Sequence, residues 1–186
     1  MLSIKREKGF TLVELLIVVA IIAVLVAISI PIFTAQLEKS RNATDIANAK
    51  AMDDALKVYY LSNYDTDEAL STQRIWGVDE GYIFVNQHGI RCAGNSYLAL
   101  IQAGYGTKSD WKKNGSNEYV STVLKCHSKT KWVKFQITFT QDSNGEMSFT
   151  YCGSTEINAG NNGNSDAFAT AINGTYKKIS LGAGEN

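Results

Sequence analysis

A short polar leader and a long apolar block form the start of the chain. Residues 1–9 carry three basic side chains and one acidic one, and residues 10–33 are apolar apart from Thr11, Glu14 and Ser29. As a helix that rises about 1.5 Å per residue, this block would be roughly 36 Å long, enough to cross a bilayer core of about 30 Å. Basic residues are clustered before the block, and no comparable cluster follows it closely. The pattern therefore predicts one membrane span with a cytoplasmic N-terminus.

The apolar block runs directly into a polar helical pattern. An ordinary secretory signal ends at a small-residue cleavage motif and is discarded, but residues 29–33 contain no such motif. We therefore expect the apolar block to remain in the mature protein.

Residues 34–61 form the second half of the same predicted helix. They contain neither Gly nor Pro, and their apolar side chains recur at steps of three and four, which places them on one helical face. That face comprises Ile46, Ala49, Met52, Leu56 and Tyr59, and the opposite face carries Glu38, Arg41, Asp45 and Lys57. We expect one helix over residues 10–61, apolar all round in its first half and amphipathic in its second.

The remainder of the chain consists of short segments with strand and turn patterns. Apolar and polar residues alternate over residues 133–139 and again over 147–151, and residues 142–145 supply a turn between them. This pattern predicts a β-hairpin with one buried face. Residues 82–85 are a weaker strand candidate, and residues 153–166 have the composition of a loop. The expected fold class is α+β, with the second half of the long helix packed on a small antiparallel sheet.

The junction between the leader and the apolar block carries a recognisable motif. Residues 8–31 read KGFTLVELLIVVAIIAVLVAISIP. This stretch resembles the N-terminus of the type IV pilin superfamily, which includes the pseudopilins of type II secretion, and Pro31 stands at the family's usual place. The resemblance covers roughly the first third of the chain. It implies a pilin-like fold and a structural subunit that is not an enzyme.

The resemblance also implies how the chain is processed. In the family, a membrane aspartyl peptidase cuts between the Gly and the Phe and methylates the new amino terminus. Gly9 and Phe10 would be that site, residues 1–9 the removed leader, residues 10–33 the transmembrane and filament-core helix, and residues 34–186 the extracellular head. The precursor would be a single-pass membrane protein, and the mature subunit would lie in a pilus on the cell surface. Its partners would be further copies in a helical filament, other pilins, the peptidase, and an inner-membrane assembly platform with its ATPase.

Glu14 and Pro31 are the candidate assembly residues. A carboxylate inside hydrocarbon costs about 2.5 to 3.5 kcal/mol on insertion scales and is usually paired or functional. The resemblance implies that Glu14 pairs with the freed amino group of Phe10 in a neighbouring subunit; a Glu reaching to the membrane interface is the alternative. Pro31 removes the hydrogen bond to the carbonyl of Ala27 and should kink or loosen the helix.

The chain contains three cysteines, all in the part expected outside the membrane. A disulfide between Cys126 and Cys152 is the preferred interpretation, since disulfides form in many cell envelopes. Three reduced, buried thiols are a second interpretation. A zinc site formed by Cys92, Cys126 and Cys152 with His88 or His127 is a third, because three Cys and one His complete a tetrahedron. We otherwise expect no metal and no cofactor.

The charge balance argues against a nucleic-acid partner, and the low histidine content argues against catalysis. Lys plus Arg and Asp plus Glu balance at 18 each, so the chain has no excess of positive charge, and nucleic acid is not an expected partner. The chain has 2 histidines and no evident nucleophile with a base. The preferred function is a subunit of an extracellular type IV pilus that serves adhesion, motility or aggregation. The alternative is a pseudopilin of a type II secretion or DNA-uptake system.

Overall fold

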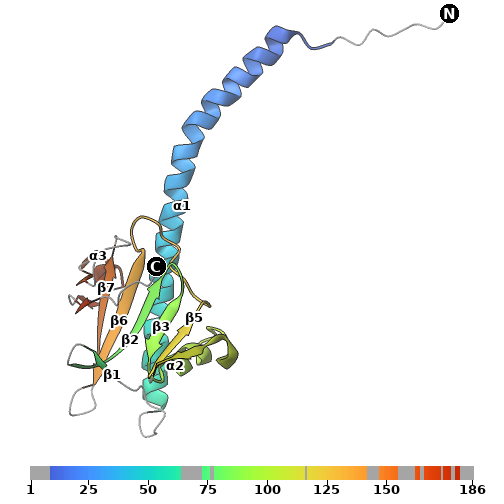
Figure 1. The fold of residues 1–186 in the computed structure, drawn as a ribbon. Coiled ribbons are helices and arrows are strands. Elements are labelled where there is room, and N and C mark those ends of the chain that lie inside the picture. Colours follow the sequence, from blue (N-terminus) through green and yellow to red (C-terminus); the bar gives the residue numbers. More distant parts are fainter. Residues whose placement is uncertain are drawn as a thin grey trace, which may run out of the picture. The chain divides into compact units, whose positions relative to one another are not determined.

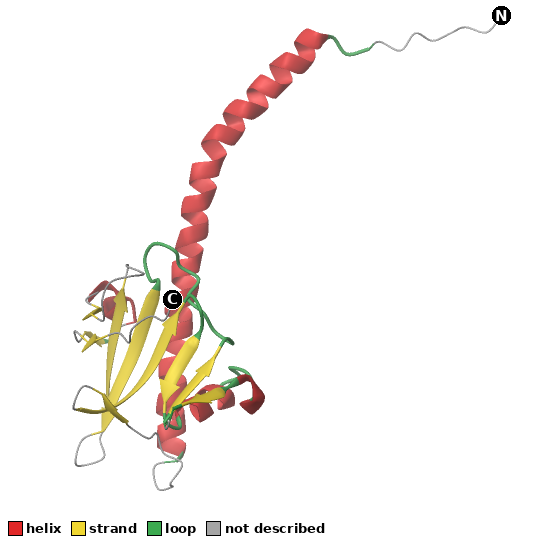
Figure 2. Ribbon diagram, viewed as in Figure 1, coloured by secondary structure: helices red, strands yellow, loops and turns green. Residues whose placement is uncertain are grey.

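The computed structural model describes residues 9–63, 73–75, 78–115, 117–141, 147–154, 162–163, 166–172, 174–176 and 179–180. The chain divides into two compact units, Met1–Lys39 and Ser40–Asn186. The first unit contains the apolar part of the long helix α1, and the second, the head, contains the rest of α1 and all the strands (Figures 1 and 2).

Helix α1 spans Leu12–Ser62, which confirms the single long helix that the sequence predicts. It begins at Leu12 and not at Phe10, because the side chains of Thr11 and Glu14 cap its first turn. Pro31 lies inside the helix, and the helix continues through it. Two side chains bond to carbonyl oxygens near this proline: Ser29 Oγ donates to Leu25 O at 2.6 Å and Thr34 Oγ1 to Pro31 O at 3.0 Å.

One large sheet forms the head, and among the described residues its strand order is β4-β5-β3-β2-β6-β7-β9, with β1 paired to β2. Neighbouring strands are antiparallel except for β7 and β9, which are parallel. The six central strands confirm the expected α+β class. The strands are β1 Gln73–Ile75, β2 Val78–Asn86, β3 Ile90–Ala93, β4 Lys112–Asn114, β5 Glu118–Ser121, β6 Lys134–Gln141, β7 Met147–Ser154 and β9 Thr175–Tyr176, with a separate pair β8 Asn162–Gly163 and β10 Ile179–Ser180. The shorter helices are α2 Ser96–Gln102, the 3-10 turn η1 Lys108–Asp110 and α3 Asp166–Ile172.

The predicted hairpin is confirmed as β6 and β7, with Phe139 opposite Phe149 and Ile137 opposite Tyr151. Its turn at residues 142–145 lies outside the described residues. The expectation of a single buried face is wrong, because the polar residues of β6 are buried as well: Lys134, Gln136 and Thr138 are each at most 4% exposed. The physical reason is that the outer face of the sheet has an apolar cluster of its own, made of Tyr82, Phe84, Ala93 and Cys152.

The main core lies between the sheet and the head's part of α1, which Figure 2 shows running behind the strands. The predicted apolar face of the helix is confirmed, because Ala49, Met52 and Leu56 have no exposed surface. Burying a Met or Leu side chain contributes about 1.5 to 3 kcal/mol to the stability of the fold. From the sheet, the core receives Ile83, Val85, Phe135, Ile137, Phe139 and Tyr151.

Candidate functional site

The start of α1 is a capping box formed by Thr11 and Glu14. Glu14 Oε2 accepts hydrogen bonds from the Thr11 backbone N–H at 2.9 Å and from Thr11 Oγ1 at 2.7 Å. In return, Thr11 Oγ1 accepts from the Glu14 backbone N–H at 3.3 Å. The carboxylate that the sequence singles out is therefore held by its own chain in the isolated subunit. The hydrophobic pattern does not reveal this role of Thr11, although a Thr followed three residues later by Glu before an apolar run is the signature of a capping box.

The residues of the expected cleavage site lie directly before this cap. Phe10 is 79% exposed, and a Cβ placed on Gly9 would have nothing within 4 Å. The described part of the chain therefore imposes no steric reason for a glycine at position 9. Any requirement for a residue without a side chain must come from a partner that approaches this backbone, as a peptidase does.

The part of α1 in the first unit exposes a long apolar surface. Its large apolar side chains from Phe10 to Phe33 are 45% to 79% exposed. Among the described residues, α1 is the one helix long and apolar enough to cross a membrane, judged by length and composition. An apolar surface that is continuous around a helix is covered in the cell by lipid or by other protein.

The cysteines lie on two sides of the sheet. Cys92 and Cys126 belong to the core under α1, whereas Cys152 belongs to the outer cluster. All three are free and buried thiols, so the bridge expected between Cys126 and Cys152 is not formed in this structure, because the sheet stands between the two side chains. Burial raises the pKa of the Cys92 and Cys126 thiols, which keeps them protonated at neutral pH.

The structure does not bring the alternative zinc ligands together. His88 is exposed in the turn after β2, where its backbone N–H donates to Asn86 Oδ1 at 2.8 Å. Cys152 lies across the sheet from Cys92. Within the described part of the chain, no three His, Cys, Asp or Glu side chains are grouped so that they could hold a metal ion.

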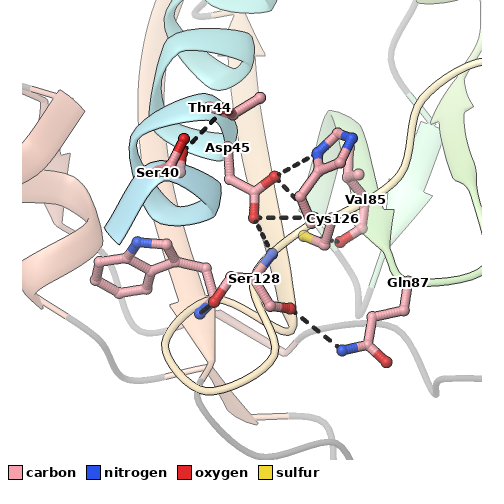
Figure 3. A network of polar contacts seen from close by, with 9 residues as sticks. Ser40, Thr44, Asp45, Val85, Gln87, Cys126 and Ser128 are labelled. Carbon is pink, nitrogen blue, oxygen red and sulfur yellow. Dashed lines mark hydrogen bonds and ion pairs between the residues drawn. The ribbon is translucent and has the colours of Figure 1, made fainter. Parts of the chain in front are cut away.

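The prediction that Asp45 lies on the solvent face of the helix is wrong, because this residue has no exposed surface. It joins α1 to the β5–β6 loop, residues 122–133, as Figure 3 shows. Asp45 Oδ1 accepts from the His127 backbone N–H at 2.9 Å and contacts His127 Nδ1 at 3.0 Å, and Oδ2 accepts from the Ser128 backbone N–H at 2.8 Å. The partners are over eighty residues away, so helical periodicity could not reveal them.

The comparisons with known proteins agree with these features. Residues 4–30 match the family described as the prokaryotic N-terminal methylation motif. The chain is 30% identical over 125 residues to the type IV major fimbrial protein FimA of Dichelobacter nodosus, which covers 63% of this chain and 76% of FimA. It is 46% identical over 55 residues to the type IV major pilin protein PilA of Myxococcus xanthus, a match that covers 30% of this chain and 25% of PilA. It is 32% identical over 59 residues to the type II secretion system core protein G of Escherichia coli, a match that covers 32% of this chain and 41% of protein G.

No solved structure matches the chain. The chain spans less than half of the PilA and protein G sequences, and each of these matches covers about a third of this chain. The FimA match is different, because it extends over three quarters of that protein. Together with the processing motif, the capped apolar helix and the α+β head, this match shows that the chain belongs to the type IV pilin superfamily.

Proposed function

We propose that this chain is a structural subunit of an extracellular type IV pilus that serves adhesion, motility or aggregation. The observation that carries the proposal is the exposed first half of α1, which is apolar except for a few residues such as Glu14 and Ser29 and needs lipid before assembly and neighbouring helices afterwards. The FimA match, which covers 63% of this chain and 76% of FimA, supports a pilus subunit. The non-enzymatic role is supported by the relatives, which carry the names of pilins and of a secretion-system component.

The proposed maturation begins with a cut between Gly9 and Phe10 and methylation of Phe10. Residues 1–9 are then lost, residues 10–33 anchor the precursor in the membrane and later lie in the filament core, and residues 34–186 form the exposed head. The family match over residues 4–30 supports this scheme, because that family is described as a methylation motif. A prepilin peptidase, an assembly platform and an ATPase are the partners that such a pathway requires.

Glu14 has two partners in succession under this proposal. In the isolated subunit, the capping box with Thr11 satisfies one carboxylate oxygen. In the filament, the amino group of Phe10 in a neighbouring subunit replaces Thr11 and neutralises the charge. A charge without a partner in an apolar environment costs several kcal/mol, so a subunit that enters in the wrong register is rejected.

A pseudopilin of a type II secretion or DNA-uptake system is the second candidate, favoured by the match to core protein G. Deletion of the gene separates the two. We expect long surface filaments to disappear on electron micrographs while exoprotein export is unchanged. Loss of export in cells that never show such filaments would instead assign the chain to a secretion system.

A further inference from the structure

A row of four side chains crosses strands β2, β3, β5 and β4 on the outer face of the sheet. Phe84 stands opposite Arg91. Arg91 stands opposite Val120, which in turn stands opposite Lys112. Residues directly opposite each other in neighbouring strands share a face of the sheet, and Phe84 belongs to the apolar cluster of the outer face. The whole row therefore lies on that face, where Figure 1 shows β2, β3 and β5 side by side.

The four side chains line a hollow of about 310 Å³, together with residues of the β2–β3 turn and of η1. Its volume is at the small end of the range of about 300 to 1,000 Å³ that is typical of ligand pockets. Phe84 and Val120 give the hollow an apolar surface. The described residues that line it all belong to the head, so the hollow is a feature of the head alone.

Arg91 is a cation in a fixed position in this hollow. Its guanidinium carbon lies 4.8 Å from the centre of the Phe84 ring, and its side chain is only 22% exposed. Glu118 Oε1 lies 3.9 Å from Arg91 Nε, which is longer than a hydrogen bond. The Glu118 carboxylate has closer partners, because Oε1 accepts from the Tyr82 hydroxyl and Oε2 accepts from Asn114 Nδ2 at 2.6 Å. The charge of Arg91 is therefore held in place but only loosely compensated.

The hollow also contains a carboxylate and a second cation. Asp110 Oδ2 accepts from the Thr107 backbone N–H at 2.7 Å and from Thr107 Oγ1 at 2.8 Å. These bonds hold the carboxylate in place and lower its pKa, so that it is ionised at neutral pH. Lys112 is exposed at the start of β4. Two cations and one carboxylate thus border the apolar surface.

This combination of groups selects a ligand that has an acidic group, hydroxyl groups and a small apolar face. A guanidinium binds a carboxylate through parallel N–H bonds. Hydroxyl groups donate to a carboxylate such as that of Asp110, whereas a bare anion such as phosphate is repelled by it. The C–H face of a sugar ring fits an apolar surface. A uronic acid, which is a sugar that carries a carboxylate, has all of these properties.

We propose that this hollow binds a uronic acid residue of a polysaccharide, with Arg91 and Lys112 on its carboxylate and Asp110 on its hydroxyl groups. Binding itself needs only the head. Its role, attachment of a pilus to an acidic polysaccharide, rests on the proposed pilus subunit. Many copies along a filament would bind together, so that weak single sites give firm attachment.

Ligand-observed NMR on the purified full chain in detergent tests the proposal, with the methyl glycoside of glucuronic acid as the probe. We expect the probe to bind, and methyl glucoside, which lacks the carboxylate, to bind roughly tenfold or more weakly. Inorganic phosphate at the same concentration should not displace the probe. An absence of probe binding, equal binding of the two sugars, or displacement by phosphate would overturn the proposal.

Lys112 and Lys113 provide a matched pair of variants. Both are exposed on β4, but adjacent strand residues point to opposite faces, and Lys113 stands opposite Tyr119, which packs against the main core. K112Q should weaken probe binding several-fold and K113Q should leave it unchanged. R91K keeps the charge but loses the planar fork, so it should bind the probe more weakly than the wild type does. Equal affinities of the K112Q and K113Q variants would contradict the proposed site even if Arg91 variants fail to fold.

Attachment is measured separately from binding. We expect cells with the K112Q variant to show filaments like those of the wild type on electron micrographs, and to retain fewer beads coated with a glucuronic acid polysaccharide. Cells with the K113Q variant should retain as many beads as the wild type. Probe binding by a chain whose cells never show filaments would support the site and refute the pilus subunit on which the attachment role rests.

Discussion

Replacing Asp45 with Ala should unfold the head at a much lower denaturant concentration. The carboxylate accepts two backbone N–H groups, from His127 at 2.9 Å and Ser128 at 2.8 Å, and it contacts the His127 ring. The Ser128 N–H is buried, so it loses its partner without gaining water. A buried donor left unpaired costs about 1 to 3 kcal/mol, and bonds to a charged acceptor lie at the upper end.

We therefore expect Asp45→Ala to lower the free energy of unfolding by about 4 kcal/mol, counting both backbone donors. The whole free energy of unfolding of a typical domain is roughly 5 to 15 kcal/mol. With a urea slope of about 2 kcal/mol per molar, the midpoint should fall by roughly 2 M. Asp45→Asn keeps one oxygen acceptor, so it should lower the free energy of unfolding by about half as much as Asp45→Ala.

The assay is urea unfolding of the full chain in detergent, followed by tryptophan fluorescence, to which Trp132, buried at the end of the same loop, contributes. Asp54→Ala is the matched control, because Asp54 lies on the same helix and is exposed, and surface substitutions usually change stability by less than about 0.5 kcal/mol. Equal midpoints for Asp45→Ala and Asp54→Ala would show that the buried carboxylate does not hold the loop.

The remaining predictions concern the N-terminus and the thiols. Glu14→Ala should permit cleavage and methylation but strongly reduce filament number on electron micrographs, since the register-setting charge pair is lost; unchanged filaments would contradict the pairing. Thr11→Val removes the cap, worth about 1 kcal/mol, and should lower the immunoblot level of unassembled subunit, whereas Thr11→Ser should not; equal levels would argue against a role for the capping box. Buried thiols react slowly with alkylating reagents because the reagent cannot reach them. In the absence of reductant, mass spectrometry should therefore find Cys92, Cys126 and Cys152 alkylated only after the chain has been unfolded. Fewer than three labels in that unfolded sample would indicate a disulfide.

The sequence predicts this fold well wherever local periodicity carries the information. The helical face with Ala49, Met52 and Leu56 follows from spacing alone, and so does the β6–β7 hairpin. Periodicity fails for Asp45, because an acid on a helix is stable in a buried position only when distant backbone donors surround it. It fails also for Lys134, since an alternating pattern assigns polar residues to solvent even when the second face of the sheet is covered.

In the candidate site, too, the sequence reveals linear motifs but not contacts that depend on the fold. The motif around Gly9 and Phe10 is linear, so the sequence alone identifies it. The Thr11–Glu14 cap is also linear and could have been found by its spacing. The cysteines could not be paired from the sequence, because the side of the sheet that each one faces depends on strand register, which spacing between distant cysteines does not reveal.

We propose above that the mature subunit begins at Phe10, just before the cap of the apolar helix. The direct test is mass spectrometry of the N-terminal peptide from cells with and without a functional prepilin peptidase. We expect a methylated Phe10 at the N-terminus in the first cells and the intact leader of residues 1–9 in the second. An N-terminus after the apolar block in peptidase-containing cells would contradict it, because the helix that is proposed to build the filament would then have been removed.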